Sequence, residues 1–431
     1  MKVIKNNIYA WLIMAIIILI PVLLWFISRP VLPRFTDLDM TLTNIGQLLG
    51  LIGVAMFALS LILSSRLHVL ENYFNGLNKV YERHNQMGQI AFIILLLHPL
   101  FLLPEYSGHS WYQAALFLSP TANWPVTFGL LALGLMIILL VLTLYLRPKY
   151  NLWKITHKFL GLAFFLALIH VYLIPSDTSR YLPLRIYMLT LFVLALLGFS
   201  YRTLLGYFLI KKYQYAISKI SALSSNIVEI SMFPLKKKIN FIPGQFIFIK
   251  FLDKNLSKEI HPFSISSGSN DKNLSVTIKA LGDYTTKVAN LTLQSGVEIE
   301  GPFGTFSYQK AVNKNQIWIA GGIGITPFLS MARSLQANEN YQVDLYYCIR
   351  NDNENICKNL PQSILSLVRL INFYSDKEGY INAEIIQEKS GTFNDKDIFI
   401  CAPPLMIKVL KAQFIAKGVN KKNLHSEEFN F

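Results

Sequence analysis

Six long apolar stretches constrain this chain of 431 residues more than any other feature of its sequence. Each is close to the length of about 20 residues that an α-helix needs to cross a bilayer. The first is too long for the apolar core of a signal peptide, and no small-residue cleavage site follows it, so we expect it to remain as a span. The sequence therefore predicts a six-helix transmembrane bundle within residues 1–212. The stretches occupy residues 8–28, 42–64, 84–104, 124–146, 156–174 and 183–209.

Basic residues are distributed unevenly between the two ends of these stretches. Twelve Lys and Arg residues fall at the N-terminus and in the connections on its side, and four fall in the connections on the other side. Cytoplasmic loops carry such an excess of positive charge. We therefore expect a multi-pass protein of the cell membrane with both termini in the cytoplasm. The same distribution accounts for the net charge of +15 without a nucleic-acid partner.

Four histidines lie within or at the ends of two of the apolar stretches. His84 and His98 are 14 residues apart in the third, and His157 and His170 are 13 residues apart in the fifth. At 1.5 Å per residue these separations are rises of about 21 and 20 Å. Because the third and fifth spans run in the same direction, the first histidines of both are expected at one depth and the second histidines at another. Two imidazoles at each of two levels would ligate two stacked, six-coordinate haem irons.

Helix periodicity supports this interpretation for one span only. At 100° per residue, 14 residues return a side chain to within about 40° of its first direction, whereas 13 residues leave it about 140° away. The fifth helix must therefore be tilted or locally overwound, and Gly161 is the candidate position. The alternative interpretation is that the imidazoles line a proton or ion path. The occurrence of four histidines in two matched pairs favours haem.

Beyond residue 212 the composition becomes that of a soluble protein. Short β-rich runs between turn residues predict an antiparallel β-barrel over residues 213–310. From residue 311 to 431 strands alternate with helices, which predicts a parallel α/β domain. All three cysteines lie in this half, and the spacing of Cys348, Cys357 and Cys401 fits neither a zinc site nor a disulfide framework.

Three kinds of segment in this half could bind a cofactor, although each also has a plain structural interpretation. IAGGIGITPF places Gly322 and Gly324 between a strand and a helix, where glycines let a pyrophosphate approach the helix N-terminus, but such turns also occur for packing. In HPFSISS, Phe263 could stack on a flat ring or could be an ordinary buried Phe. LGDYTTKV and EGPFGTFS place glycines near possible phosphate donors such as Lys279 and Thr285, or are ordinary barrel turns.

Taken together, these segments resemble those of the NADPH oxidases and ferric reductases. HPFSISS is similar to the flavin-binding HPFT segment of that family. FIPGQFIFIKF, LGDYTTKV, EGPFGTFS, AGGIGITPF and ICAPPLM are similar to its PGQ, GDWT, GPFG, GxGxTPF and CGPP elements, in the same order. The two histidine spacings match the haem ligands on the family's third and fifth spans. The resemblance covers about residues 40–431. It implies a FAD-binding β-barrel followed by an NADPH-binding α/β domain, as in ferredoxin-NADP reductases.

The resemblance also implies roles for individual residues. It places Cys401 near the nicotinamide and the terminal Phe431 over the flavin, and these two are the expected catalytic residues. Without the family, Cys401 would be a small buried hydrophobe and Phe431 a frayed terminus. Arg350 would meet the 2′-phosphate of NADPH. The remaining nucleotide-site residues would be Gly322, Gly324, Thr326 and Pro327. The FAD-site residues would be His261, Pro262, Phe263, Ser264, Lys279, Gly282, Asp283 and Thr285.

Two departures from the family pattern bear on function. Animal superoxide-producing oxidases carry a second histidine one turn after the outer ligand of the third span, where this chain has Leu102. The chain also shows no calcium-binding extension or long regulatory N-terminus. It therefore resembles the bacterial members, and we expect a protein of the inner membrane that needs no regulatory subunit.

The expected function is transmembrane electron transfer. Electrons would pass from cytoplasmic NADPH through FAD and two b-type haems to an acceptor on the outer face. The acceptor would be O₂, giving superoxide, or alternatively a ferric chelate. Two other classes remain open, namely a transporter or haem-sensing module with a flavin-regulated gate, and a quinone-linked cytochrome. No span is expected to carry a buried acidic or basic residue outside the histidine pairs, which argues against a transporter.

Overall fold

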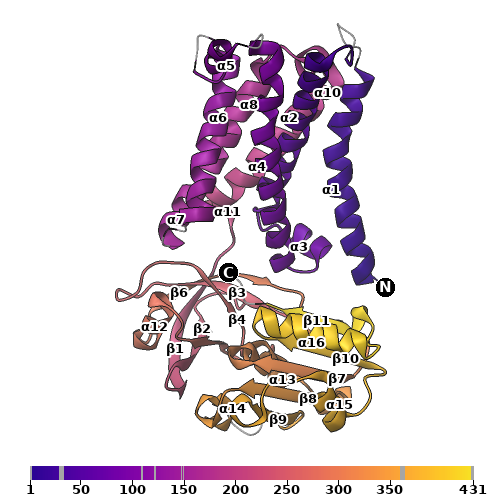
Figure 1. The fold of residues 1–431 in the computed structure, drawn as a ribbon. Coiled ribbons are helices and arrows are strands. Elements are labelled where there is room, and N and C mark those ends of the chain that lie inside the picture. The colour runs from indigo at the N-terminus through magenta and orange to yellow at the C-terminus, as the bar shows by residue number, and fades with distance from the viewer. Residues whose placement is uncertain are drawn as a thin grey trace. The chain divides into compact units, whose positions relative to one another are not determined.

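The structure of the protein is a computed structural model that describes residues 2–28, 34–107, 110–120, 123–146, 148, 150–359 and 365–428. The chain divides into two compact units, one comprising Lys5–Ile210 and another that begins at Lys211 (Figure 1). The first unit is helical, and the second contains two β-sheets.

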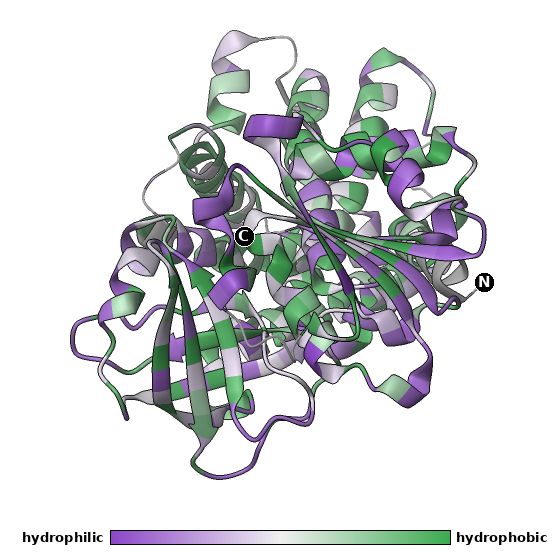
Figure 2. Cartoon of the chain, turned by 90° about the horizontal axis from the view of Figure 1, so that it is seen from below, coloured by the Kyte–Doolittle hydropathy of each residue, from purple (hydrophilic) through white to green (hydrophobic). Residues whose placement is uncertain are grey.

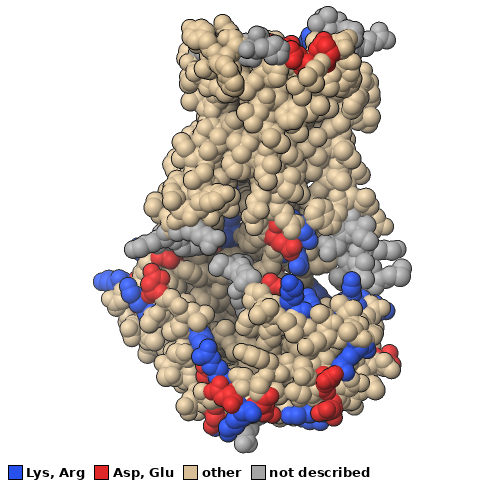
Figure 3. All heavy atoms as spheres, in the orientation of Figure 1, with Lys and Arg blue, Asp and Glu red and all other residues tan. Residues whose placement is uncertain are grey.

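The helical unit contains the expected transmembrane bundle. Among the described residues, six helical segments are long and apolar enough to cross a membrane, so the predicted number of spans is confirmed. α2 packs against α4 and α10, and α6 packs against α8. On the face shown in Figure 3, the charged side chains of this unit lie near its two ends. The main helices are α1 (Lys2–Ile27), α2 (Leu38–Leu63), α4 (Leu77–Ser107), α6 (Trp124–Val141), α8 (Leu160–Leu173) and α10 (Leu182–Phe199). The short helices are α3 (His68–Phe74), α5 (Trp111–Phe117), α7 (Tyr150–Lys158), α9 (Asp177–Arg180) and α11 (Gly206–Leu209).

The fifth span is interrupted at Phe159, between α7 and α8. The N–H of Phe159 donates to the carbonyl three residues earlier at 3.0 Å, and its own carbonyl accepts from the N–H three residues later at 2.9 Å. This spacing is that of the more tightly wound 3₁₀-helix. Gly161 lies two residues after the interruption. A Cβ on it would be 2.3 Å from the ring of Phe199 on α10, so the close approach of α10 requires a glycine there. The local overwinding expected between His157 and His170 is therefore found close to the predicted position.

The second unit begins with an antiparallel sheet of six strands. A bridge between Ile265 and Val276 connects the two ends of this sheet, which therefore curls into the expected barrel. Hydrophobic and hydrophilic residues alternate along its strands (Figure 2), as expected when one face of a sheet covers a core. The fully buried Tyr215, Ile247 and Phe251 belong to that core. In order along the sheet the strands are β4 (His261–Ser264), β3 (Phe246–Phe251), β6 (Gly296–Phe303), β1 (Tyr213–Ser224), β2 (Ile227–Pro234) and β5 (Leu274–Lys279).

A parallel five-stranded sheet follows, as the alternation of strands and helices predicts. From β7 the chain moves to β8 and β9 on one side and then to β10 and β11 on the other. In open α/β sheets, ligands bind at such a reversal, outside the carboxyl ends of the strands. Here the reversal lies between β7, which ends at Gly321, and β10, which ends at Cys401. The strands are β7 (Asn315–Gly321), β8 (Gln342–Ile349), β9 (Arg369–Tyr374), β10 (Lys396–Cys401) and β11 (Leu424–Glu427). The main helices are α13 (Thr326–Ser334), α15 (Ala383–Ser390) and α16 (Pro404–Ala416).

Candidate functional site

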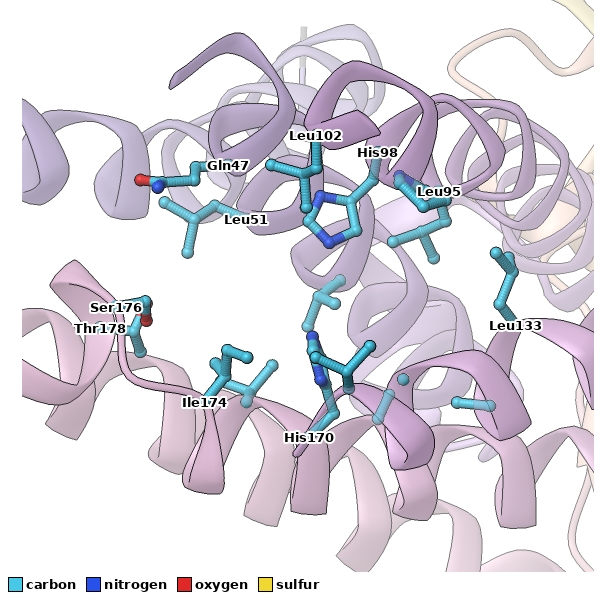
Figure 4. A pocket seen from close by; sticks show the side chains of 18 of the residues that line it. Gln47, Leu51, Leu95, His98, Leu102, Leu133, His170, Ile174, Ser176 and Thr178 are labelled. Carbon is cyan, nitrogen blue, oxygen red and sulfur yellow. The ribbon is translucent and has the colours of Figure 1, made fainter. Parts of the chain in front are cut away.

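A cavity of about 410 Å³ lies inside the helical unit between His98 and His170. Figure 4 shows the two rings pointing toward one another across it, one from α4 and one from α8. Leu51, Leu95 and Leu133 are among the residues that line the cavity, so much of its wall is apolar. The cavity can therefore enclose a large apolar group between two imidazoles.

Backbone carbonyls fix the orientation of both imidazoles in this pair. The Nδ1 of His98 is 2.7 Å from the carbonyl oxygen of Gly46, and the Nδ1 of His170 is 2.7 Å from that of Pro125. A carbonyl oxygen can only accept, so each Nδ1 carries a proton. In the neutral imidazole the Nε2 then keeps its lone pair, which is the form that ligates a metal.

Glycines make room for the same two rings. A Cβ at Gly50 on α2 would lie 2.9 Å from the His98 ring, and a Cβ at Gly129 on α6 would lie 2.9 Å from the Nδ1 of His170. Any larger residue at either position would displace an imidazole. By contrast, a Cβ at Gly134, also on α6, would have no atom within 4 Å. The observed positions of His98 and His170 therefore require glycine at positions 50 and 129.

The second pair, His84 and His157, lies further along the same two spans. Its ring centroids are 6.0 Å apart. With metal–nitrogen bonds near 2 Å, a metal between two imidazoles would hold their centroids about 6 Å apart. The Nδ1 of His84 is 2.8 Å from the carbonyl oxygen of Ser60, so this ring is oriented like those of the first pair. The Nδ1 of His157 is buried and has no hydrogen-bond partner among the described residues. The structure thus brings together both histidine pairs that the sequence predicts.

The predicted flavin-binding residues lie on β4, at the end of β5 and around the short helix α12 (Asp283–Lys287). The ring centroids of His261 and Tyr284 are 3.9 Å apart, and this contact joins the HPFS and GDYT segments. Phe263 is half-buried on an edge strand, whereas Ser264 is buried. Tyr284 is not among the residues predicted from the sequence, although it occupies the aromatic position of the GDYT segment, which was the available signal.

The turn around α12 presents backbone and side-chain groups at the surface. Gly282 precedes the helix, is exposed together with Asp283, and has no atom within 4 Å of where a Cβ would be. The hydroxyl oxygen of Thr285 accepts from the N–H of Gly282 at 3.0 Å and from the preceding N–H at 2.9 Å. Lys279 ends β5 and is half-buried. An anionic group can reach this turn without displacing a side chain.

The glycine-rich turn lies at the reversal point of the parallel sheet. A Cβ at Gly324 would lie 2.0 Å from the carbonyl oxygen of Cys401, so only glycine allows the ends of β7 and β10 to meet. Gly322 has a φ of +56° and open space around it. Thr326 and Pro327 form the buried first turn of α13. The turn thus offers accessible backbone at a helix N-terminus, which suits a pyrophosphate.

Two of the remaining predicted residues are described and one is not. Arg350 is exposed and directly follows β8, the strand next to β7. Cys401 is fully buried at the end of β10. Phe431 lies outside the described residues.

Burial makes Cys401 unreactive. Its loss of solvation, assisted by the charge of Glu427, raises the pKa of the thiol well above its ordinary value. Since the thiolate is the nucleophilic form, iodoacetamide should leave Cys401 unmodified in the folded protein even at pH 9. After unfolding, the same residue should react readily, as mass spectrometry of its peptide would show. Equal labelling rates before and after unfolding would contradict this prediction.

Models of three protein families match consecutive segments of the chain. A ferric reductase-like transmembrane component matches residues 49–168, a FAD-binding domain matches residues 212–322, and an oxidoreductase NAD-binding domain matches residues 318–412. NADPH oxidase 1 of Mus musculus is 32% identical over 124 residues, which are 28% of this chain and 20% of that protein. Ferric reduction oxidase 8 of Arabidopsis thaliana is 35% identical over 134 residues, covering 27% and 18% of the two chains.

The chain belongs to the NADPH oxidase and ferric reductase family. Its domain content fits an NAD(P)H-dependent oxidoreductase of that family. The match spans a fifth or less of the length of the two family members named above. A longer match is that to the toluate 1,2-dioxygenase electron transfer component of Pseudomonas putida, at 25% identity over 235 residues, or 50% of this chain and 67% of that protein.

Proposed function

We propose that this member of the NADPH oxidase and ferric reductase family carries electrons across a membrane, from NADPH to an acceptor on the outer face. FAD and two b-type haems would be its resident cofactors. When bound, FAD takes up a hydride and gives up single electrons, and haem iron takes up and passes on one electron at a time. The observation that carries the proposal is the pair of imidazoles at each of two levels, with rings oriented by backbone carbonyls.

The helical unit would hold the two haems through its four histidines. His98 and His170 would ligate the outer haem, and His84 and His157 the inner one. The carbonyls that accept from the Nδ1 atoms of three of these rings fix the orientation of the rings and leave each Nε2 as the atom that would bind the metal. The apolar walls of the cavity between His98 and His170 would suit the faces of a porphyrin.

The second unit would hold FAD and NADPH. Phe263 and Ser264 would contact the flavin ring, and Lys279 and Thr285 would lie near its pyrophosphate. Gly322 and Gly324 would let the pyrophosphate of NADPH approach the backbone at the start of α13. A neutral Cys401 would border the nicotinamide without placing a charge beside it.

We infer the following topology for the membrane. The uneven distribution of Lys and Arg supports a cytoplasmic second unit and cytoplasmic termini. A bacterial inner membrane and activity without a regulatory subunit are part of the same proposal. Reporter fusions at either end of the chain should show both termini on the side of NADPH. A terminus on the opposite side would contradict the inferred topology.

Dioxygen is the first choice of acceptor, and superoxide the product. Because His98 and His170 would both hold the outer haem, the acceptor would take its electron without binding to the metal. O₂ is small and apolar enough to approach through the apolar wall of the cavity. A ferric chelate at the outer face is the alternative, which the similarity to a ferric reduction oxidase supports.

An acceptor assay separates these two functions. The purified chain with NADPH in air should reduce cytochrome c in a reaction that superoxide dismutase suppresses. Reduction of a ferric chelate at the full rate without oxygen, together with no superoxide in air, would instead identify a ferric reductase.

Arg350→Ala should change the preference between nucleotides. If Arg350 meets the 2′-phosphate, its loss removes a charge-assisted hydrogen bond of about 1.5–3 kcal/mol, which is roughly 10–100-fold in affinity. The KM for NADPH should rise by that factor while the KM for NADH stays unchanged. Arg369→Ala is the matched control, because Arg369 begins β9 and so lies at the opposite end of the parallel strands from Arg350, which follows the end of β8. An equal effect of Arg350→Ala on both nucleotides would contradict the assignment.

A further inference from the structure

Helix α13 connects the two candidate cofactor sites of the second unit. Its first turn, at Thr326 and Pro327, adjoins the glycine-rich nucleotide turn. Its last turn packs on residues 266–269, which directly follow the flavin-segment strand β4. Seven residues separate Thr326 from Arg333, a rise of about 10 Å. The position of this helix therefore sets the separation between the two sites.

Arg333 makes the most polar of these contacts. One of its terminal nitrogens donates to a carboxylate oxygen of Glu229 on β2 at 2.8 Å and to the carbonyl oxygen of Ser266 at 2.7 Å. The side chains of Arg333 and Glu229 are only 11% and 15% exposed. The hydroxyl of Ser266 donates to the same carboxylate oxygen at 3.2 Å. These three residues form a partly buried link between the parallel sheet and the barrel.

Serines and a glycine complete the contact. The Ser330 hydroxyl donates to the carbonyl oxygen of Ser267 at 2.7 Å, and the Ser334 hydroxyl accepts from the N–H of Ser269 at 3.0 Å. A Cβ at Gly268 would lie 2.9 Å from the carbonyl oxygen of Arg333, so the two backbones are as close as a glycine allows. The helix thus cannot shift along the segment after β4 without breaking several hydrogen bonds at once.

We propose that Arg333 is a positioning residue for hydride transfer: through Glu229 and Ser266 it fixes the nucleotide turn relative to the flavin-binding strand. This inference rests on the proposed NADPH-to-FAD reaction. The side chain of Arg333 hydrogen-bonds to none of the described residues that are predicted to bind FAD or NADPH, and it would act through Glu229 on β2 and the segment that follows β4. Such a residue should affect the rate of hydride transfer more than the binding of either cofactor.

The rate is the sensitive quantity because hydride transfer needs the two reacting atoms in close contact. A misplacement of about 1 Å can lower the rate of such a step on the order of 100-fold. Without the guanidinium, the Glu229 carboxylate would remain partly buried without its cation, and the Ser266 carbonyl would lose its donor. A buried charge without a partner is unfavourable, so α13 and the segment after β4 should move apart.

The test uses the full-length chain and stopped-flow reduction of its flavin by NADPH without oxygen. Arg333→Met keeps much of the side-chain length and removes the charge. Arg369→Met is the matched control, since Arg369 also pairs with a carboxylate, that of Asp344 at 2.7 Å, but within one sheet. The expected result for Arg333→Met is a limiting rate lower by roughly 10–100-fold. The FAD content and the Kd for NADPH should stay close to those of the unmodified protein.

Arg333→Lys should retain part of the rate that Arg333→Met loses, because the Lys ammonium group keeps the positive charge but lacks the planar set of N–H donors of a guanidinium. Arg369→Met should reduce its flavin at the unmodified rate. The proposal is overturned if Arg333→Met keeps the full rate, or if the control slows equally.

A second variant decides the outcome if Arg333→Met loses its FAD or does not fold. Ser330→Ala removes one hydrogen bond from the same contact and should lower the limiting rate while FAD stays bound. An unchanged rate in Ser330→Ala would then overturn the proposal. Failure of the proposed function would be distinguishable, because NADPH would then not reduce the flavin of the unmodified protein. That result would overturn this inference as well.

Discussion

Gly129→Ala should remove one of the two haems, while Gly134→Ala should leave both in place. Both glycines lie on α6, but only the first faces a histidine. A Cβ at Gly129 would lie 2.9 Å from the Nδ1 of His170 and 3.0 Å from its Cε1, whereas one at Gly134 would have no neighbour within 4 Å. The new methyl group would push the imidazole away from its ligating position and from the carbonyl of Pro125.

Haem content per chain, measured after extraction into pyridine, checks this prediction. It should fall from two haems to about one in Gly129→Ala and stay at two in Gly134→Ala. Gly50→Ala should reproduce the loss from the opposite side of the cavity, because a Cβ there would lie 2.9 Å from the His98 ring. Full haem content in both close-contact variants would show that the imidazoles of this pair are not ligands.

His98→Ala should separate the two halves of the electron path. Loss of this ligand should remove the outer haem, so transfer to any acceptor on the outer face should fall to background. Reduction of the flavin by NADPH should continue at the unmodified rate, because that reaction takes place in the second unit.

Two assays on one preparation check the second prediction. One follows anaerobic bleaching of the flavin, and the other follows reduction of the outer acceptor. His68→Ala is a suitable control, since His68 begins the short helix α3 and its side chain is 61% exposed. Continued reduction of the outer acceptor by His98→Ala would mean that electrons reach it by a route without this histidine.

The sequence allowed prediction of the spans, the strands and the histidine pairs because each has a local signal. Apolar length marks the membrane helices, and alternation marks the barrel strands. The spacing within the third and fifth spans identified all four histidines. The spacing of 13 residues between the two histidines of the fifth span does not fit a regular helix, and it correctly indicated an irregular one. The structure places the irregularity at Phe159.

Other parts of the site have no local signal, because they depend on segments that meet only in the fold. The carbonyl that orients His98 belongs to Gly46, and the one that orients His170 belongs to Pro125, 52 and 45 residues away in the chain. The roles of Gly50 and Gly129 depend on which helix face meets an imidazole. The link between Arg333 and Glu229 spans 104 residues. Such contacts become visible only when helix packing is known.

The proposed electron path requires that four histidines hold two iron porphyrins, one over the other, within the helical unit. The most direct measurement is the visible spectrum of the purified protein before and after NADPH is added without oxygen. We predict the bands of bis-histidine haem, which NADPH then converts to the reduced form. A colourless, iron-free protein after expression with ample porphyrin would contradict the claim.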